Sequence, residues 1–213
     1  MRANHRAGRV LTLVLTAAGA LCIAGCVAGV QQTTVEPPGP TPAFTRVAVV
    51  QFFDESNYDS YGYGMKFARA LTGSLARHAS FADVFAVSRD SLESFENPFE
   101  TGKMPLDVLV SSRSRNMADL AVLGCIHRLD PYRMPSVGVA VKVLETRSGR
   151  VLFSLSGDWD AANHATQRQV EAYCRQYSDS QGCRYGAELF YNSPLSFLRF
   201  AADDLAKRIT AEL

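Results

Sequence analysis

Alternating apolar residues in the second half of the chain constrain its fold more than any other feature. Apolar residues occupy every second position from Val137 to Val143 and again from Val151 to Leu155, and a polar turn, residues 145–150, joins the two stretches. A period of two is typical of a strand that has one covered face. Residues 137–157 are therefore predicted to form a β-hairpin whose apolar face needs a second layer to cover it.

The rest of the chain supplies further strands and the helices for that layer. Apolar β-branched runs predict strands over residues 46–53, 81–87 and 118–129. Apolar residues at helical spacing predict helices over residues 65–78, 106–117, 165–177 and 194–213. Helical connections imply parallel pairing of the early strands. The predicted fold class is α/β (mixed α+β): one domain, with a mixed sheet of about five strands, an antiparallel hairpin and helices packed on the sheet.

The first 25 residues have the layout of a bacterial secretory signal peptide. Three arginines precede an apolar run without charge, Val10 to Ile23, and small residues then lead into Cys26. The run is shorter than the roughly 20 residues that a membrane-spanning helix needs. Residues 1–25 are therefore predicted to be a signal peptide.

The sequence Ile23-Ala24-Gly25-Cys26 resembles the lipobox of bacterial lipoproteins. The resemblance implies that Cys26 is the lipidation site, with diacylglycerol on its thiol and an acyl chain such as palmitate on the new amino group. Val27, and not Asp, follows the cysteine. By resemblance to enterobacterial sorting rules, this implies a lipid anchor in the outer membrane that faces the periplasm. An ordinary secreted protein or a short amino-terminal anchor is the alternative.

A polar segment separates the cysteine from the predicted domain. Residues 26–45 are predicted to be a lipidated Cys and a flexible tether, because a segment rich in Gln, Thr, Pro and Gly cannot bury a core. A proline-rich docking motif, or a strand added to a neighbouring subunit, is the alternative. The domain then spans residues 46–213. The chain has 22 basic and 21 acidic residues with no basic face, so no nucleic-acid partner is expected.

Two of the remaining cysteines flank a polar loop. Cys174 and Cys183 enclose residues 175–182, and an exported chain lies in a compartment that permits disulfides. We predict that they are paired, which would stabilise the fold by roughly 2–3 kcal/mol. Two free thiols or half of a metal site is the alternative. Cys125 lies in an apolar run and is interpreted as a small buried hydrophobe.

The sequence contains none of the GxSxG, HExxH or GxxxxGK[ST] motifs. Asp54, Asp59 and His127 are the candidates for a hydrolase or small-ligand site, and Cys125 with His127 is the candidate nucleophile pair. No metal site and no cofactor is predicted. The chain is therefore predicted not to be an enzyme, with an envelope hydrolase or a small-ligand-binding lipoprotein as the alternative.

The loop after the first predicted strand is the candidate partner contact. Its candidate residues are Asp54, Tyr58, Asp59, Tyr61 and Tyr63. Aromatic residues are enriched at protein contacts. We therefore expect this loop to bind an envelope protein or a second copy of the chain.

Several of these segments together resemble one group of proteins. The strand Val47–Phe53, the helix after Gly64, the strand Ala118–Gly124 and the hairpin with Thr146–Gly149 at its turn are similar to periplasmic lipoproteins of the CsgG, PelC and LpoB type and to the TolB amino-terminal domain. The resemblance implies a non-enzymatic scaffold or accessory subunit of a cell-envelope assembly, in export of polysaccharide or protein fibres or in regulation of a cell-wall synthase. It also implies protein partners, a possible homo-oligomer, and membrane lipid contacted through acylated Cys26. The chain lacks the long amphipathic hairpins of the curli channel type, which favours an accessory role.

Overall fold

A computed structural model describes residues 31–34, 44–56, 58, 61–91, 97–102, 108, 112–114, 117–177, 183 and 186–213. The predicted signal peptide, Cys26 and Asp59 lie outside the described residues, as does most of the helix predicted over residues 106–117.

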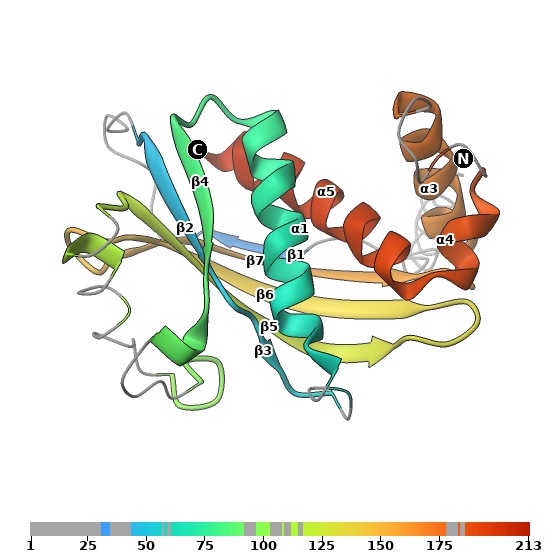
Figure 1. The fold of residues 1–213 in the computed structure, drawn as a ribbon, viewed down its shortest axis with the longest axis horizontal. Coiled ribbons are helices and arrows are strands. Elements are labelled where there is room, and N and C mark those ends of the chain that lie inside the picture. Colours follow the sequence, from blue (N-terminus) through green and yellow to red (C-terminus); the bar gives the residue numbers. More distant parts are fainter. Residues whose placement is uncertain are drawn as a thin grey trace, which may run out of the picture.

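The described strands form one mixed sheet (Figure 1). They are β1 (Gln31–Thr34), β2 (Arg46–Val50), β3 (Phe53–Asp54), β4 (Asp83–Val87), β5 (Leu120–Asp130), β6 (Ser136–Glu145) and β7 (Val151–Asp160). Their order is β1-β7-β6-β5-β2-β4, and β3 pairs with β5. β2 pairs in parallel with β4 and β5, whereas β5, β6, β7 and β1 pair in antiparallel fashion. The predicted mixed sheet and the antiparallel hairpin are thus confirmed.

Helices cover the face of the sheet that bears the alternating valines. They are α1 (Tyr63–His78), α3 (His164–Gln176), α4 (Glu188–Asn192) and α5 (Pro194–Glu212), and a 3₁₀ turn, η2, spans Arg89–Ser91. Figure 1 shows α1 and α5 lying across the sheet, with α3 and α4 at one end. The starts of α3 and α5 follow from local sequence. At the start of α3, the Asn163 side chain accepts a hydrogen bond from Ala165 N at 2.7 Å. At the start of α5, the Ser193 side chain accepts one from Ser196 N at 3.3 Å, and Pro194 lies in the first turn.

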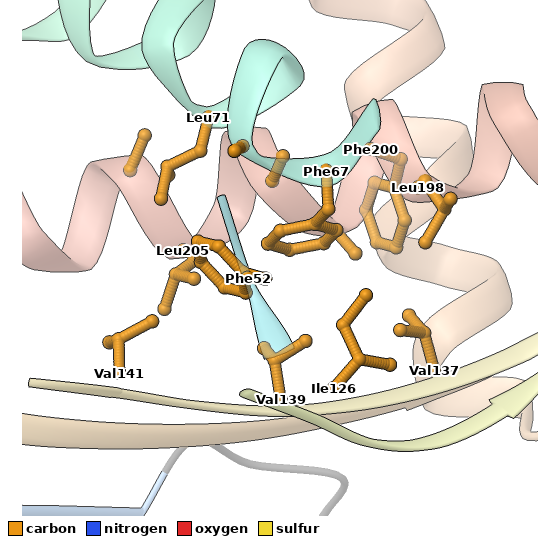
Figure 2. Packing of buried hydrophobic residues seen from close by; sticks show 14 of the residues in the cluster. Phe52, Phe67, Leu71, Ile126, Val137, Val139, Val141, Leu198, Phe200 and Leu205 are labelled. Atoms are coloured by element: carbon orange, nitrogen blue, oxygen red, sulfur yellow. The ribbon is translucent and has the colours of Figure 1, made fainter. Parts of the chain in front are cut away.

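The core fills the space between these helices and the sheet (Figure 2). In Figure 2, Phe67 of α1 points toward Val139 of β6, Leu205 of α5 lies above Val141 of the same strand, and Phe52 lies between the layers. The ring centroids of Phe52 and Phe67 are 4.9 Å apart. Gly124 of β5 lies directly beneath Phe52, and a β-carbon on it would collide with the Phe52 ring. The absence of a side chain at residue 124 therefore admits the ring to the core.

The sheet has seven strands where the sequence predicts about five. One extra strand arises because the predicted strand over residues 46–53 divides into β2 and β3. At the division, Gln51 N donates to Val87 O at 2.8 Å, and Phe52 N donates to Gly64 O at 3.4 Å. Gln51 thus keeps one hydrogen bond to β4, whereas Phe52 bonds to the start of α1 and its ring enters the core.

The other extra strand, β1, comes from the predicted tether. Its four residues pair with β7, from Gln31 opposite Ser156 to Thr34 opposite Phe153. The sequence predicts an unpaired segment here, and these four residues differ from that prediction. Without β1, β7 would be an edge strand, whose open row of N–H and C=O groups is a template for a further strand.

Candidate contact surface

Four tyrosines meet where β3 leads into α1 and where β5 turns into β6. We call Tyr58, Tyr61, Tyr63 and Tyr132 the tyrosine surface. The ring centroids of Tyr58 and Tyr61 are 6.3 Å apart, those of Tyr61 and Tyr63 are 6.2 Å apart, and Tyr132 meets Tyr58 edge-on at 5.9 Å. Tyr61 is 63% exposed and Tyr132 is 67% exposed, whereas Tyr63 is buried. The structure therefore brings together three of the predicted contact residues and adds Tyr132, which sequence spacing does not connect with them.

Asp54, another predicted contact residue, shapes the loop beneath these rings. Its Oδ1 accepts from Ser56 N at 3.0 Å and from the Ser56 hydroxyl, and Tyr58 N donates to Ser56 Oγ at 3.2 Å. Aspartate and serine side chains commonly hold tight turns in this way. Asp54 thus acts as a turn residue that positions Tyr58.

Lys66, one turn into α1, carries positive charge to the edge of the tyrosine surface. Its Nζ donates to Tyr61 O at 2.7 Å and lies 4.8 Å from the centroid of the Tyr63 ring. Burial raises the pKa of Tyr63, and the hydrogen bond with Tyr132 is the main cause that raises the pKa of Tyr58. Both phenols therefore stay neutral at pH 7, and the surface is aromatic with a cationic edge.

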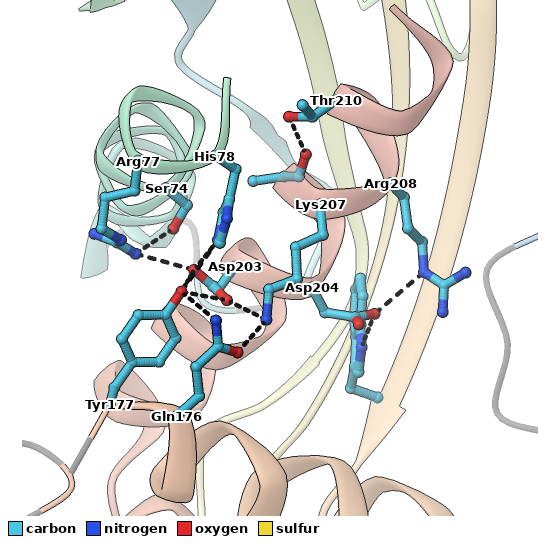
Figure 3. Close-up of polar contacts among 12 residues, drawn as sticks. Ser74, Arg77, His78, Gln176, Tyr177, Asp203, Asp204, Lys207, Arg208 and Thr210 are labelled. Atoms are coloured by element: carbon cyan, nitrogen blue, oxygen red, sulfur yellow. Dashed lines mark hydrogen bonds and ion pairs between the residues drawn. The ribbon is translucent and has the colours of Figure 1, made fainter. Parts of the chain in front are cut away.

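A buried carboxylate organises a second polar cluster, at the far end of α1 (Figure 3). Asp203 of α5 is 0% exposed and lies 3.1 Å from Arg77 Nη2, 2.8 Å from His78 Nε2 and 3.1 Å from Lys207 Nζ. Tyr177, just after α3, places its hydroxyl 3.3 Å from Asp203 Oδ1. Asp203 therefore joins α1, α5 and the end of α3.

The ionisation of Asp203 follows from these contacts. Burial acts to raise the pKa of Asp203, but hydrogen bonds from His78, Lys207 and Arg77 outweigh it and hold that pKa below its usual value. The carboxylate is thus charged and compensated at neutral pH. No sequence pattern marks this cluster, because Asp203 and Arg77 are 126 residues apart in the chain.

Cys174 and Cys183 are free thiols in this structure. Burial, together with the Cys183 thiol, raises the pKa of Cys174 to about 12. Cys174 is the residue of α3 three positions before Tyr177, and residues 178–182 lie outside the described residues. The disulfide between Cys174 and Cys183 stays a prediction.

His127 and Cys125, the candidate nucleophile pair, have separate surroundings. A register shift between Ile126 and Arg128 marks a bulge in β5. His127 Nε2 lies 3.7 Å from Asp158 Oδ1, and Arg128 Nη2 lies 3.2 Å from the same oxygen. His127 and Asp158 meet over Gly138, which has no side chain to separate them. Cys125 is buried, and burial together with a hydrogen bond to Glu55 raises its pKa, so its thiol stays protonated. This geometry does not favour a thiolate nucleophile.

The described part of the chain contains neither a metal-binding cluster nor a helix that could span a membrane. No group of three or more His, Cys, Asp or Glu side chains there is arranged to hold a metal ion. Within the same residues, no helix combines the length and the apolar character that crossing a bilayer requires.

The described residues thus define a mixed α/β domain with an exposed tyrosine surface and a buried charge cluster. Solved structures similar to it include the PelC dodecamer from Paraburkholderia phytofirmans, with 17% identity over 86% of this chain and 95% of that chain and a TM-score of 0.49. Lipoprotein GNA1162 from Neisseria meningitidis has 14% identity over 64% of this chain and 99% of that chain, with a TM-score of 0.41. The LpoB C-terminal domain from Salmonella enterica has 14% identity over 56% of this chain and 84% of that chain, with a TM-score of 0.30.

PelC and LpoB both belong to the group that the sequence resembles, so members of that group are among the structural neighbours. No family model and no curated protein matches the sequence.

Proposed function

We propose that this chain is a lipid-anchored periplasmic lipoprotein of the outer membrane that serves as a non-enzymatic accessory subunit of a cell-envelope assembly. The tyrosine surface carries the proposal. Two of its rings, Tyr61 and Tyr132, are more than 60% exposed, although the fold buries most of its other large apolar side chains. Exposed aromatic residues next to a cation are typical of protein contacts. The function is thus placement at the membrane and contact with a partner.

Photo-crosslinking tests the contact. A photoreactive phenylalanine analogue would replace Tyr61 or Tyr132 in cells. Arg147, which is exposed in the turn between β6 and β7 near the start of β5, would be the control position. We expect one and the same envelope protein, or a second copy of this chain, to be captured from positions 61 and 132 and not from 147. Capture from all three positions alike, or from none, would reject the tyrosine surface as the contact.

The lipid anchor supports the same proposal and has a separate test. The support is the basic, apolar and small-residue order that ends in Cys26. Two or three acyl chains would hold the domain firmly, at about 0.8 kcal/mol for each buried methylene. Labelling with radioactive palmitate should mark the wild type and not Cys26→Ala. Equal labelling of both proteins would remove the anchor from the proposal.

We also propose that Cys174 and Cys183 form a disulfide in the periplasm. The effect of Cys183 on the pKa of Cys174 supports this pairing, since only a nearby thiol has such an effect. The bridge would fasten the segment after α3, in which Tyr177 contacts Asp203.

A further inference from the structure

A groove runs along the solvent side of the contact between α1 and α5. It has a volume of about 290 Å³, and we call its lining residues the basic groove: Lys66, Arg69, Ala70, Leu195, Leu198 and Arg199. Three of these residues lie on α1 and three on α5, in each case at positions i, i+3 and i+4. That spacing places each trio on one face of its helix.

All three charged residues of the basic groove are cations. Over the described residues, none of Lys66, Arg69 and Arg199 has a carboxylate within ion-pair distance. The other end of the same helix pair differs, because Arg77 and Lys207 both pair there with Asp203. The groove is therefore a local cluster of three positive charges with no carboxylate paired to them among the described residues.

The groove is also partly apolar. Leu195 is 43% exposed at its rim, and Leu198 and Ala70 are less exposed below it. Lys66 connects the groove to Tyr61, another of the exposed large apolar side chains. A ligand that fits this surface has negative charge together with apolar parts, which is the chemistry of an anionic phospholipid.

The path of the chain brings the domain near a source of such lipid. The proposed lipidation site, Cys26, precedes β1 by only residues 27–30. β1 pairs with β7, and Trp159 Nε1 of β7 donates to Asp204 Oδ2 of α5 at 3.2 Å. The anchor therefore leads through two strands to the helix that carries Leu195 and Arg199. A short connection of this kind keeps headgroups at a high effective concentration.

From these observations we infer that the basic groove docks on anionic phospholipid headgroups of the leaflet that holds the anchor. The arginines and Lys66 contact phosphate, and Leu195 contacts the glycerol and upper acyl region. The inference rests on the proposed anchor for its geometry. It is a second membrane contact, in addition to the acyl chains, and it orients the domain on the bilayer.

Vesicle sedimentation tests the inference without the anchor. The chain from residue 26 onward, with Cys26→Ser, would be mixed with vesicles of phosphatidylcholine alone or of phosphatidylcholine and phosphatidylglycerol in equal parts. A basic residue near an anionic surface contributes about 1 kcal/mol, so Arg69→Gln and Arg199→Gln should each weaken binding to the mixed vesicles about fivefold. The control variants Arg147→Gln and Arg168→Gln remove the same charge from exposed positions outside the groove and should change binding less than twofold.

Three results would overturn the inference. These are equal sedimentation with both kinds of vesicle, equal weakening by groove and control variants, and saturable binding of inorganic phosphate by a chain that does not sediment with either kind of vesicle. The last result would assign the groove to a free anion. Because the tested chain has no acyl group and no partner, these outcomes are independent of the palmitate and crosslinking experiments.

Discussion

Replacement of Asp203 tests how the structure holds its helices together. Asp203→Asn keeps the shape of the side chain and removes its charge, which leaves three basic groups without their shared anion. Breaking a fully buried ion pair costs about 3–5 kcal/mol. Arg77 and Lys207 are 49% and 39% exposed and can regain water, so we expect the free energy of unfolding to fall by a smaller amount, about 2–3 kcal/mol. For a domain of this size, that is a fall in Tm of roughly 4–12 °C.

Urea unfolding followed by circular dichroism measures the loss, and pH adds a second readout. The folded pKa of Asp203 lies below its unfolded value of about 3.9. Its contribution is therefore fully present above that unfolded value and is lost as the pH falls through the lower folded pKa. The difference between wild type and Asp203→Asn should be constant near pH 7 and shrink in strong acid.

A surface carboxylate provides the matched control. Asp83 pairs with Arg46 at 3.0 Å, and both side chains are more than a third exposed. Asp83→Asn should cost less than about 1 kcal/mol. If Asp203→Asn unfolds at the same urea concentration as the control, or if its deficit does not change with pH, the cluster does not stabilise the fold as described.

Three further predictions concern the core, the thiols and the tyrosine surface. Gly124→Ala should destabilise by about 1–3 kcal/mol because its β-carbon meets the Phe52 ring, and a urea midpoint that is unchanged or higher would contradict this. Gly73→Ala, exposed in α1, should stabilise by roughly 0.5–1 kcal/mol, and a lower urea midpoint would contradict that. Alkylation of the periplasmic wild type without reductant should leave Cys174 and Cys183 unmodified. In Cys174→Ser, the thiol of Cys183 should become available for alkylation. Alkylation of both cysteines in the wild type would disprove the disulfide. Tyr61→Ala should change the free energy of unfolding by less than about 0.5 kcal/mol and remove the crosslink formed from position 132, and an unchanged crosslink would disprove the contact.

Much of the sheet could be predicted because its side chains alternate. The hairpin predicted over residues 137–157 matches β6 and β7, and the helices predicted at 65–78 and 165–177 match α1 and α3 closely. Each of these elements has one buried face, so its apolar residues recur at regular spacing in the sequence. Ser193-Pro194 likewise predicted the start of α5, because a cap and a proline act locally.

The features that were missed depend on partners far away in the chain. β1 forms because β7 offers an open edge, and no alternation marks Gln31–Thr34 as a strand. Asp203 follows Ala202 on a helix whose apolar stripe gives no sign of a buried charge, and its partners on α1 are more than 120 residues away. Tyr132 joins the other tyrosines only after β5 places its end beside α1.

The pairing of β1 changes what the segment after Cys26 does. An unpaired tether from residue 26 to Phe44 would span up to roughly 60 Å and hold the domain well away from the bilayer. With β1 on β7, only residues 27–30 separate the proposed anchor from the sheet, and they span at most roughly 17 Å. Thr45 and Arg46 are held independently, because Asp119 Oδ2 accepts from their backbone N–H groups at 2.9 and 3.0 Å. Thr45 and Arg46 therefore keep their place without β1, and, given the proposed lipidation of Cys26, the pairing of β1 with β7 would keep the domain close to the bilayer.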